Sequence, residues 1–390
     1  SDMAAKRKSP LKKLLLVPLA VIAVVCVVVF AMTFLSVQQK LKAKAQNVQR
    51  SMEEWVDDGY DPSAALAVMK EVPAAAEGED AAENVEKLLN KAQALLDAPE
   101  EKRPKAKQAS GEEPSDLYLN PQPVDIEGYD GQSMEPFISP DGKYLFFNNE
   151  NDSGVDIDLH VAERMETNSF RYLGELKGAN TGDLDACAGM DTKGRFYFTT
   201  SREYAKTFKS IYSGVFEQAR IGNLHVVTGG LSPNKLGTIN MDIGISPDGN
   251  TMYISRAVFK PGLTVPKESD LMVAHARDGN FEMDPQSRAI MKTINTSQLE
   301  YAPAISADGR ELYFTRAQAP EAAVSGPQFR IMVATRASAG APFGRPRVLT
   351  ALTGIIEAPT VSLDLHEMFF HKKVNGKWVV WRAVRKGSKP

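Results

Sequence analysis

The chain has 390 residues, a formal net charge of −3 and two cysteines. This length allows two or three structural units, one of them with a sizeable core. Outside the N-terminus, lysine and arginine are not gathered on any one predicted element, so nothing points to nucleic-acid binding. Cys26 lies in an apolar run and Cys187 in a predicted strand; we expect no disulfide framework and interpret both as small buried hydrophobic residues.

The first predicted element is a membrane span. Residues 14–35 run LLLVPLAVIAVVCVVVFAMTFL and carry no charge. A helix of this length measures about 33 Å, enough for a hydrocarbon core of about 30 Å. The apolar core of a secretory signal is usually shorter, about 7–15 residues, so an uncleaved anchor is predicted. The basic residues are denser before the span than after it, which by the positive-inside rule places residues 1–13 in the cytoplasm.

A helical stalk is predicted over residues 36–98. A polar helix continues to about Trp55, Asp61 and Pro62 start a second helix through about Val72, and Pro73 and Gly78 end that segment. A third helix covers 81–98, so a helical hairpin is expected. It is either a self-packed spacer or a docking surface for a membrane partner. Residues 99–115 are charged and contain Pro and Gly, which is typical of a linker.

Short strands and turns follow from residue 116 to the end. Five related segments appear when the chain is aligned on itself: EPFISPDGKYLFF (135–147), DACAGMDTKGRFYF (185–198), DIGISPDGNTMYI (242–254), APAISADGRELYF (302–314) and APTVSLDLHEMFF (358–370). Their common aspartates, 50 to 60 residues apart, are Asp141, Asp191, Asp248, Asp308 and Asp364. A period of this size indicates a propeller, a solenoid or an array.

Each unit has the local signals of a hairpin with further strands. Ser-Pro-Asp-Gly is a turn sequence, because Pro fixes φ, Asp bonds its own backbone and Gly accepts a positive φ. Third strands are predicted at 158–164, 210–217, 270–277, 330–336 and 378–384, and weaker fourth strands at places such as 170–176 and 347–349. The pattern predicts an all-β propeller of about five four-stranded blades, with six as the alternative. The last unit lacks a fourth strand, and we expect Leu117 to Ile126 to supply it and close the ring.

One repeat carries a family resemblance. Residues 300–314 match E-x-x-P-x-x-S-x-D-G-x-x-L-Y-F, and with the later D-I/L-x-V-A-x-R strands this resembles the WD40-like PD40 repeats of TolB-type bacterial propellers, over about residues 117–385. The resemblance implies an envelope protein that acts as a scaffold or binding module. With the predicted span it gives a single-pass protein of the bacterial inner membrane, with the propeller in the periplasm. Two units depart from the pattern, at Thr192-Lys193-Gly194 and at Leu365, and distorted turns are expected there.

Acidic residues recur at or just before the predicted innermost strands. They are Glu135, Asp183, Asp185, Asp242, Glu300 and Glu357. In a propeller such positions crowd around one mouth of the central channel, where carboxylates repel one another. Three interpretations stay open: acids that cap strands, a mouth that binds a cation or a basic peptide, and a glycosidase-like acid pair. The third rests on Glu135, Asp185 and Asp242 in equivalent places of successive units, and it needs a fixed carboxyl separation.

The sequence predicts no metal site and no cofactor. The repeat aspartates lie in turns, where bonding to the backbone is the expected role, and no histidine pairs with a cysteine at metal-ligand spacing. A phosphate-binding loop, a dinucleotide fingerprint and a serine nucleophile elbow are all missing from the sequence.

Aromatic residues on long loops are the other binding candidates. The loops at 203–209, 257–268 and 317–328 give their units extra length, and Tyr204, Phe208, Phe259 and Phe329 lie on or beside them. We expect these residues to contact a partner.

The main functional hypothesis is a non-enzymatic accessory or scaffold subunit that docks partner proteins in an integral membrane complex. A periplasmic glycan-active hydrolase that uses the acidic mouth is the first alternative. A ligand-binding sensor is the second, although the few residues before the span leave no room for a cytoplasmic output domain.

Overall fold

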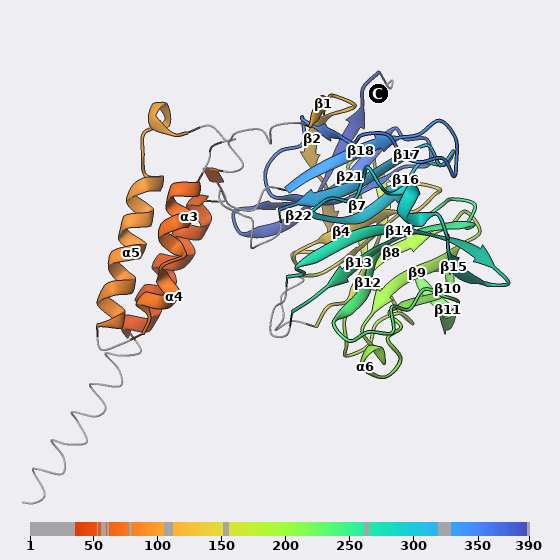
Figure 1. The fold of residues 1–390 in the computed structure, drawn as a ribbon, viewed down its shortest axis with the longest axis horizontal. Helices are drawn as coiled ribbons and strands as arrows, with labels where there is room; N and C mark the ends of the chain where they lie inside the picture. The colour runs from red at the N-terminus through yellow and green to blue at the C-terminus, as the bar shows by residue number, and fades with distance from the viewer. Residues whose placement is uncertain are drawn as a thin grey trace, which may run out of the picture. The chain divides into compact units, whose positions relative to one another are not determined.

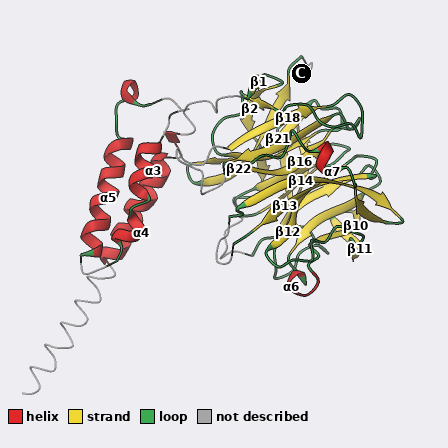
Figure 2. Ribbon diagram, viewed as in Figure 1, coloured by secondary structure: helices red, strands yellow, loops and turns green. Residues whose placement is uncertain are grey.

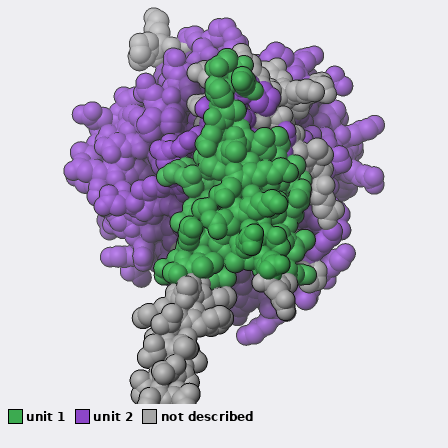
Figure 3. Space-filling model, turned by 90° about the vertical axis from the view of Figure 1, so that its left-hand side faces the viewer, with its two compact units in different colours: residues 1–52, 64–102 green, residues 53–63, 103–390 purple. Residues whose placement is uncertain are grey.

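The structure is a computed structural model that describes residues 36–52, 54–55, 60, 62–77, 80–104, 112–150, 156–260, 265–318 and 329–387. The chain divides into two compact units, residues 1–52 with 64–102 and residues 53–63 with 103–390 (Figure 3). Figure 2 shows helices in the described part of the first and mostly strands in the second. The predicted span, 14–35, lies outside the described residues, and none of the described helices has the length and apolar character to cross a membrane.

The first unit is a set of packed helices. Residues 36–52 are helical and are followed by α3 (Ser63–Met69), α4 (Val72–Ala75) and α5 (Ala81–Leu96). Side chains of the first helix reach α5: Lys44 Nζ donates to Asn90 Oδ1 at 2.9 Å, and Asn47 Nδ2 donates to Gln93 Oε1 at 3.0 Å. The apolar side chains buried in the described part of this unit include Val48, Leu89 and Leu96.

Pro73 has a different role from the expected one. It was predicted to end a helix, but it lies in the first turn of α4 and so belongs to the start of a new short helix. The first turn tolerates proline because the N–H that proline lacks has no intrahelical partner there.

The second unit is built from five blades of antiparallel strands (Figure 1). From inner to outer strand, they are blade A, β4 (Met134–Ile138), β5 (Tyr144–Asn148), β6 (Leu159–Glu166) and β7 (Ser169–Glu175); blade B, β8 (Asp185–Met190), β9 (Arg195–Thr200), β10 (Ile211–Glu217) and β11 (Arg220–Val226); blade C, β12 (Thr238–Ile245), β13 (Thr251–Val258), β14 (Glu268–Arg277) and β15 (Asn280–Met283); blade D, β16 (Leu299–Ile305), β17 (Glu311–Ala317), β18 (Phe329–Thr335) and β19 (Arg347–Leu349); and blade E, β20 (Ile356–Val361), β21 (Glu367–Val374), β22 (Lys377–Arg385) and β2 (Tyr118–Pro123).

The blades form a ring. Their innermost strands contact one another in the order β4, β8, β12, β16, β20 and back to β4. One parallel pair, Ser269 with Leu299, joins blades C and D into a nine-stranded sheet. The apolar side chains between successive blades form five buried clusters. This arrangement is that of a β-propeller, in agreement with the predicted fold.

The beginning of the propeller segment closes the ring, as predicted. Strand β2 pairs antiparallel with β22, with Tyr118 opposite Arg385, and so becomes the fourth strand of blade E. Two further short strands differ from the prediction: β3 (Asp125–Glu127) adds to β7, and β1 (Glu113–Ser115) adds to β19, both parallel. Strand β1 falls at the end of the predicted linker. It is held there because Glu112 forms ion pairs with Arg316 and Arg330 at 2.8 and 3.1 Å.

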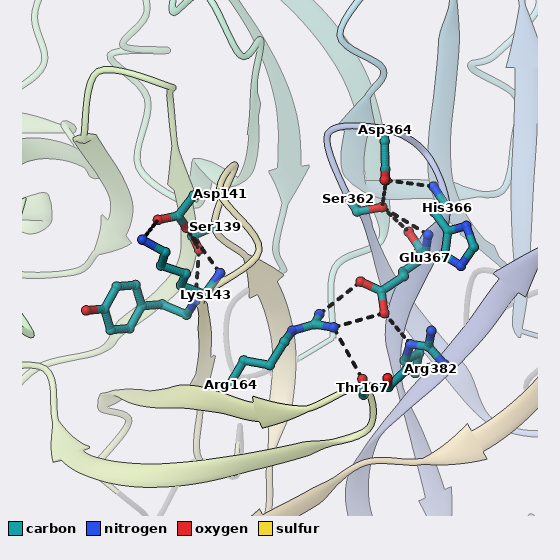
Figure 4. Close-up of polar contacts among 11 residues, drawn as sticks. Ser139, Asp141, Lys143, Arg164, Thr167, Ser362, Asp364, His366, Glu367 and Arg382 are labelled. Atoms are coloured by element: carbon teal, nitrogen blue, oxygen red, sulfur yellow. Dashed lines mark hydrogen bonds and ion pairs between the residues drawn. The ribbon is translucent and has the colours of Figure 1, made fainter. Parts of the chain in front are cut away.

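A charged cluster closes the seam between blades A and E (Figure 4). Arg164 of β6 donates from both terminal nitrogens to the carboxylate of Glu367 in β21, at 3.1 and 2.9 Å, and Arg382 of β22 donates to the same carboxylate. Two parallel hydrogen bonds fix the direction as well as the distance of the contact. The Arg164 guanidinium also lies over the ring of Phe170, 5.0 Å from its centroid.

The turn aspartates bond to their own turns, which confirms their structural interpretation. In blades A, C, D and E the serine two residues earlier donates to the aspartate at 2.6 Å, and the backbone N–H two residues later donates to it as well. Figure 4 shows this arrangement in blades A and E. The predicted distortion at Leu365 is absent: its N–H donates to Ser362 O at 2.8 Å, as the glycines do in their turns. The cost is local strain, since Leu365 has a φ of +63°.

Blade A contains a histidine buried among aromatic rings. His160 Nδ1 lies 2.8 Å from Tyr172 Oη, and its ring stacks on Phe147 with centroids 5.4 Å apart. Burial lowers the pKa of His160 to about 4. Two residues away, burial and the neighbouring carboxylates Asp156 and Glu175 raise the pKa of Asp158 to about 6.

These two groups give opposite pH dependences of stability. Unfolded His160 takes up a proton below its usual pKa of 6.5, and the folded residue does so only near 4. We therefore expect His160 to lower the free energy of unfolding by about 2–3 kcal/mol between pH 6.5 and 4.5. Folded Asp158 binds its proton at a higher pH than the unfolded residue does, so it contributes stability as the pH falls through about 6.

Urea unfolding at pH 7 and at pH 4.5 tests both expectations. His160→Phe should lose less stability on acidification than the unmodified protein, and Asp158→Asn should lose more. Equal pH dependence in all three proteins would contradict this assignment.

Candidate functional site

Each innermost strand has a β-bulge at the same level of the ring. The bulges interrupt the pairing between the first and second strands of all five blades. The turn between the first and second strands of each blade contains one residue with a left-handed backbone. The residues seven positions before it in the five blades are Glu135, Cys187, Asp242, Ala302 and Ala358. Four of them have a positive φ, between +49° and +58°, Asp242 being the exception. Such strain, about 1–3 kcal/mol per residue, is typical of functional sites, and a bulge re-aims its side chains.

Polar residues of the second strands hold the bulges. The Glu135 N–H donates to His371 Nδ1 at 2.8 Å, and the Ala358 N–H donates to Thr315 Oγ1 at 2.9 Å. Asn148 is the corresponding second-strand residue of blade A, and its Oδ1 lies 3.5 Å from the backbone nitrogen of Cys187. All three of these acceptor residues are fully buried. Since a buried N–H must find a partner, these contacts fix the bulges in place.

The bulges bring two carboxylates and a thiol together. One oxygen of Glu135, the sulfur of Cys187 and one oxygen of Asp242 all lie within 4.8 Å of one another. The thiol contacts Glu135 Oε2 and lies 3.1 Å from Asp242 Oδ1. Asp242 Oδ2 also accepts the Ala302 N–H at 3.1 Å. We call Glu135, Cys187 and Asp242 the acid–thiol cluster.

Burial controls protonation in the acid–thiol cluster. Desolvation, followed by the charges of Glu135 and Asp242, raises the pKa of the Cys187 thiol well above its ordinary value. Desolvation also raises the pKa of Asp242. The thiol is thus a hydrogen-bond donor and a poor nucleophile. A divalent metal ion could use these three ligand atoms only after displacing the thiol proton.

A small cavity extends from the acid–thiol cluster toward the turns that join the first and second strands. Its volume is about 80 Å³. The walls are apolar and include Phe137, Ile243 and Ile305, and the turn end includes Pro140 and Leu363. The site therefore has two acids at one end of an apolar passage.

The structure brings together only some of the six predicted carboxylates. Glu135 and Asp242 share the cavity. Asp185 is fully buried and accepts from Arg202 at 2.7 Å and from the backbone and side chain of Thr181. Glu300 has the same arrangement with Arg316 and Thr296. These two acids cap their strands, as the structural interpretation expected.

The other two acids lie apart from the cavity lining. Asp183 is exposed on the loop before β8. Glu357 accepts a hydrogen bond from Tyr301 Oη at 2.7 Å and lies 3.9 Å from Nε2 of the fully buried His371.

The proposed equivalence of Asp185 with Glu135 and Asp242 is wrong by two residues. In blade B, Asp191 takes the place that a serine has in the other turns: its N–H donates to Arg195 O, as Ser139 N–H donates to Tyr144 O. When the units are aligned on these aspartates, blade B is therefore two residues out of register with the other blades. Counting back from the turn glycines would have found Cys187 as the third member of the cluster.

Three of the four predicted aromatic contacts gather on one side of blades B and C. Tyr204 lies in α6 (Tyr204–Thr207), its ring is edge-on to Phe208 at 6.1 Å, and its hydroxyl donates to Thr238 O at 2.9 Å. The Phe259 N–H donates to Gly237 O at 2.8 Å. Phe329 belongs to blade D, where it begins β18.

Solved structures with a similar arrangement include TolB from Acinetobacter baumannii, at 13% identity over 66% of this chain and 55% of that chain, with a TM-score of 0.36. A putative exo-beta-1,3-galactanase from Bifidobacterium bifidum s17 is 13% identical over 70% and 96% of the two chains, with a TM-score of 0.45. A family 117 glycoside hydrolase from Zobellia galactanivorans is 11% identical over 69% and 91%, with a TM-score of 0.46. The chain thus spans about half the length of that TolB. No protein-family model and no curated protein matches the sequence.

Proposed function

We propose that this chain is a non-enzymatic docking subunit of a bacterial inner-membrane complex. Residues 14–35 anchor it, the blades are PD40-type repeats in the periplasm, and the central cavity accepts a basic side chain of a partner protein. The observation that carries the proposal is the pair of carboxylates, Glu135 and Asp242, at the end of an apolar cavity.

The chemistry of lysine and arginine fits this cavity. Both have an apolar stem and a charged tip, and they bury the stem along apolar surface. Here the stem would lie against walls such as Phe137 and Ile243, and the cation would reach the acid–thiol cluster. Burial raises the pKa of Asp242, so the ionised form of this carboxylate is disfavoured in the free protein. An incoming cation would offset this cost and favour the ionised carboxylate.

The dimensions favour a side chain over a sugar. Pockets for drug-sized ligands measure about 300–1,000 Å³, several times the 80 Å³ of this cavity. The third acid of the glycosidase hypothesis, Asp185, is neutralised by Arg202. Anchoring supports a docking role in another way: two proteins confined to one membrane meet at high effective concentration, so a single modest contact suffices.

Pull-down of the full chain in mild detergent, with mass spectrometry of what co-purifies, tests the proposal. Asp242→Asn should weaken recovery of an integral membrane partner by at least about 30-fold, because it removes one member of a buried charge pair. Asp183→Asn is the matched control and should have no effect, since Asp183 is exposed and lies outside the cavity lining. The partner should also bind less tightly as the pH falls, because a protonated Asp242 no longer attracts the cation.

Unchanged recovery with a folded Asp242→Asn variant would overturn the proposal. Turnover of a glycan that is lost in Asp242→Asn would favour the hydrolase instead.

A further inference from the structure

Three loops of blades B and C form a continuous surface at the strand ends opposite the cavity turns. They are residues 203–209, 232–238 and the described parts of 258–267, and we call this surface the lysine face. Hydrogen bonds join the loops: Ser232 Oγ donates to Phe208 O at 2.9 Å, Tyr204 Oη donates to Thr238 O, and Phe259 N–H donates to Gly237 O. The surface is therefore one structure and not three separate loops.

Exposed apolar side chains stand on the lysine face. Leu236 is 72% exposed and Val265 is 48% exposed. Of the large hydrophobic residues in the described ranges, Leu236 is the most exposed. The half-buried rings of Phe208 and Phe259 lie on the same loops. Because exposure of apolar side chains to water is unfavourable, a group of them on neighbouring loops indicates a contact surface.

The charge of the lysine face is strongly positive for a chain whose net charge is −3. Its loops carry five lysines and no arginine, and the lysines are Lys206, Lys209, Lys235, Lys260 and Lys267. One acid, Glu203, lies on the loops beside Tyr212, and Glu268, the first residue of β14, pairs with Lys267 at 2.9 Å. The described residues of the face have a net charge of +4, or +3 when the neighbouring Glu268 is included.

We propose that the lysine face binds the surface of an anionic lipid bilayer. Lysines near such a surface contribute about 1 kcal/mol each, and apolar side chains such as Leu236 enter the boundary between headgroups and acyl chains. A protein partner is less well matched, because protein interfaces are depleted in lysine and rely on Arg, Trp and Tyr. The cavity lies at the opposite strand ends, so it stays accessible when the face is on the membrane.

Amide hydrogen exchange on the full chain in lipid nanodiscs tests the proposal. One set of nanodiscs contains only phosphatidylcholine, and the other contains about 30% phosphatidylglycerol. Exchange across residues 232–238 should slow by at least about threefold in the anionic nanodiscs, and about 0.5 M salt should reverse the effect.

Two charge-matched variants complete the experiment. Lys206→Glu with Lys235→Glu should abolish the protection. Lys143→Glu with Lys193→Glu, which changes the same charge at the turn end, should leave it intact. Leu236→Ser should weaken it without loss of stability, since that side chain is mostly exposed. Equal exchange in both lipids, or protection that depends on a co-purified protein, would overturn the proposal.

Discussion

Arg316→Met should lower the free energy of unfolding by about 3–5 kcal/mol, the usual cost of breaking a buried ion pair from one side. Arg316 Nε donates to Glu300 Oε1 at 2.8 Å, and its terminal nitrogens donate to Glu112 and to Ile294 O at 2.8 and 2.7 Å. Glu300 is fully buried, and burial already raises its pKa. Without the arginine, the buried carboxylate of Glu300 would lose the cation that it contacts at 2.8 Å. Urea unfolding at pH 7 measures the loss.

The pH dependence separates this mechanism from a simple packing defect. With Arg316 removed, the folded pKa of Glu300 rises further, so the folded state binds a proton that the unfolded state does not. The deficit should therefore shrink as the pH falls toward 5. The double variant Glu300→Gln with Arg316→Met should recover much of the stability. A deficit that is the same at pH 5 and pH 7, and in the double variant, would point to packing alone.

Tyr118→Ala should cost about 3–5 kcal/mol, the range for removing a large buried aromatic side chain. Tyr118 is fully buried on β2, with its ring edge-on to Tyr313 at 5.8 Å. Its hydroxyl donates to Leu365 O at 2.7 Å, at the strained turn of blade E. The substitution would loosen the strand that closes the ring.

Tyr118→Phe is the matched control, and it should cost only about 1 kcal/mol because it removes the hydrogen bond and keeps the ring. Thermal and urea unfolding of both variants give the comparison. If the two variants were equally unstable, the hydroxyl contact and not the packing of β2 would be the main contribution.

The two proposals assign different functions to the two ends of the propeller: one end docks a partner protein, and the other binds lipid. The turn end opens to the acid–thiol cluster through an apolar passage, and the opposite end carries the lysine face. Both surfaces can be occupied at once, because they lie at opposite ends of the same strands. Loss of partner binding in Asp242→Asn would leave lipid protection unchanged, and the lysine variants should leave the cavity intact, so each proposal can fail alone.

The sequence by itself determined the repeating parts of this protein. Pro, Asp and Gly set the first turn of blades A and C through their own backbone preferences, and Asp and Gly do so without Pro in blades B and D. The alternation of apolar residues in the strands follows directly from residue order. The count of five units with one strand missing was also enough to assign Tyr118 and its neighbours to the last blade. These features are local or follow from counting, which is why they were predictable.

Only the tertiary structure decided which acids meet. Whether an acid faces the cavity depends on a bulge, and each bulge is held by contacts outside its own hairpin, such as His371 with Glu135. Asp185 and Glu300 turn instead to arginines 16 or 17 residues later in the chain. Likewise, the lysine face exists because hydrogen bonds join three separate loops. Contacts between distant residues set these positions, and no local preference encodes them.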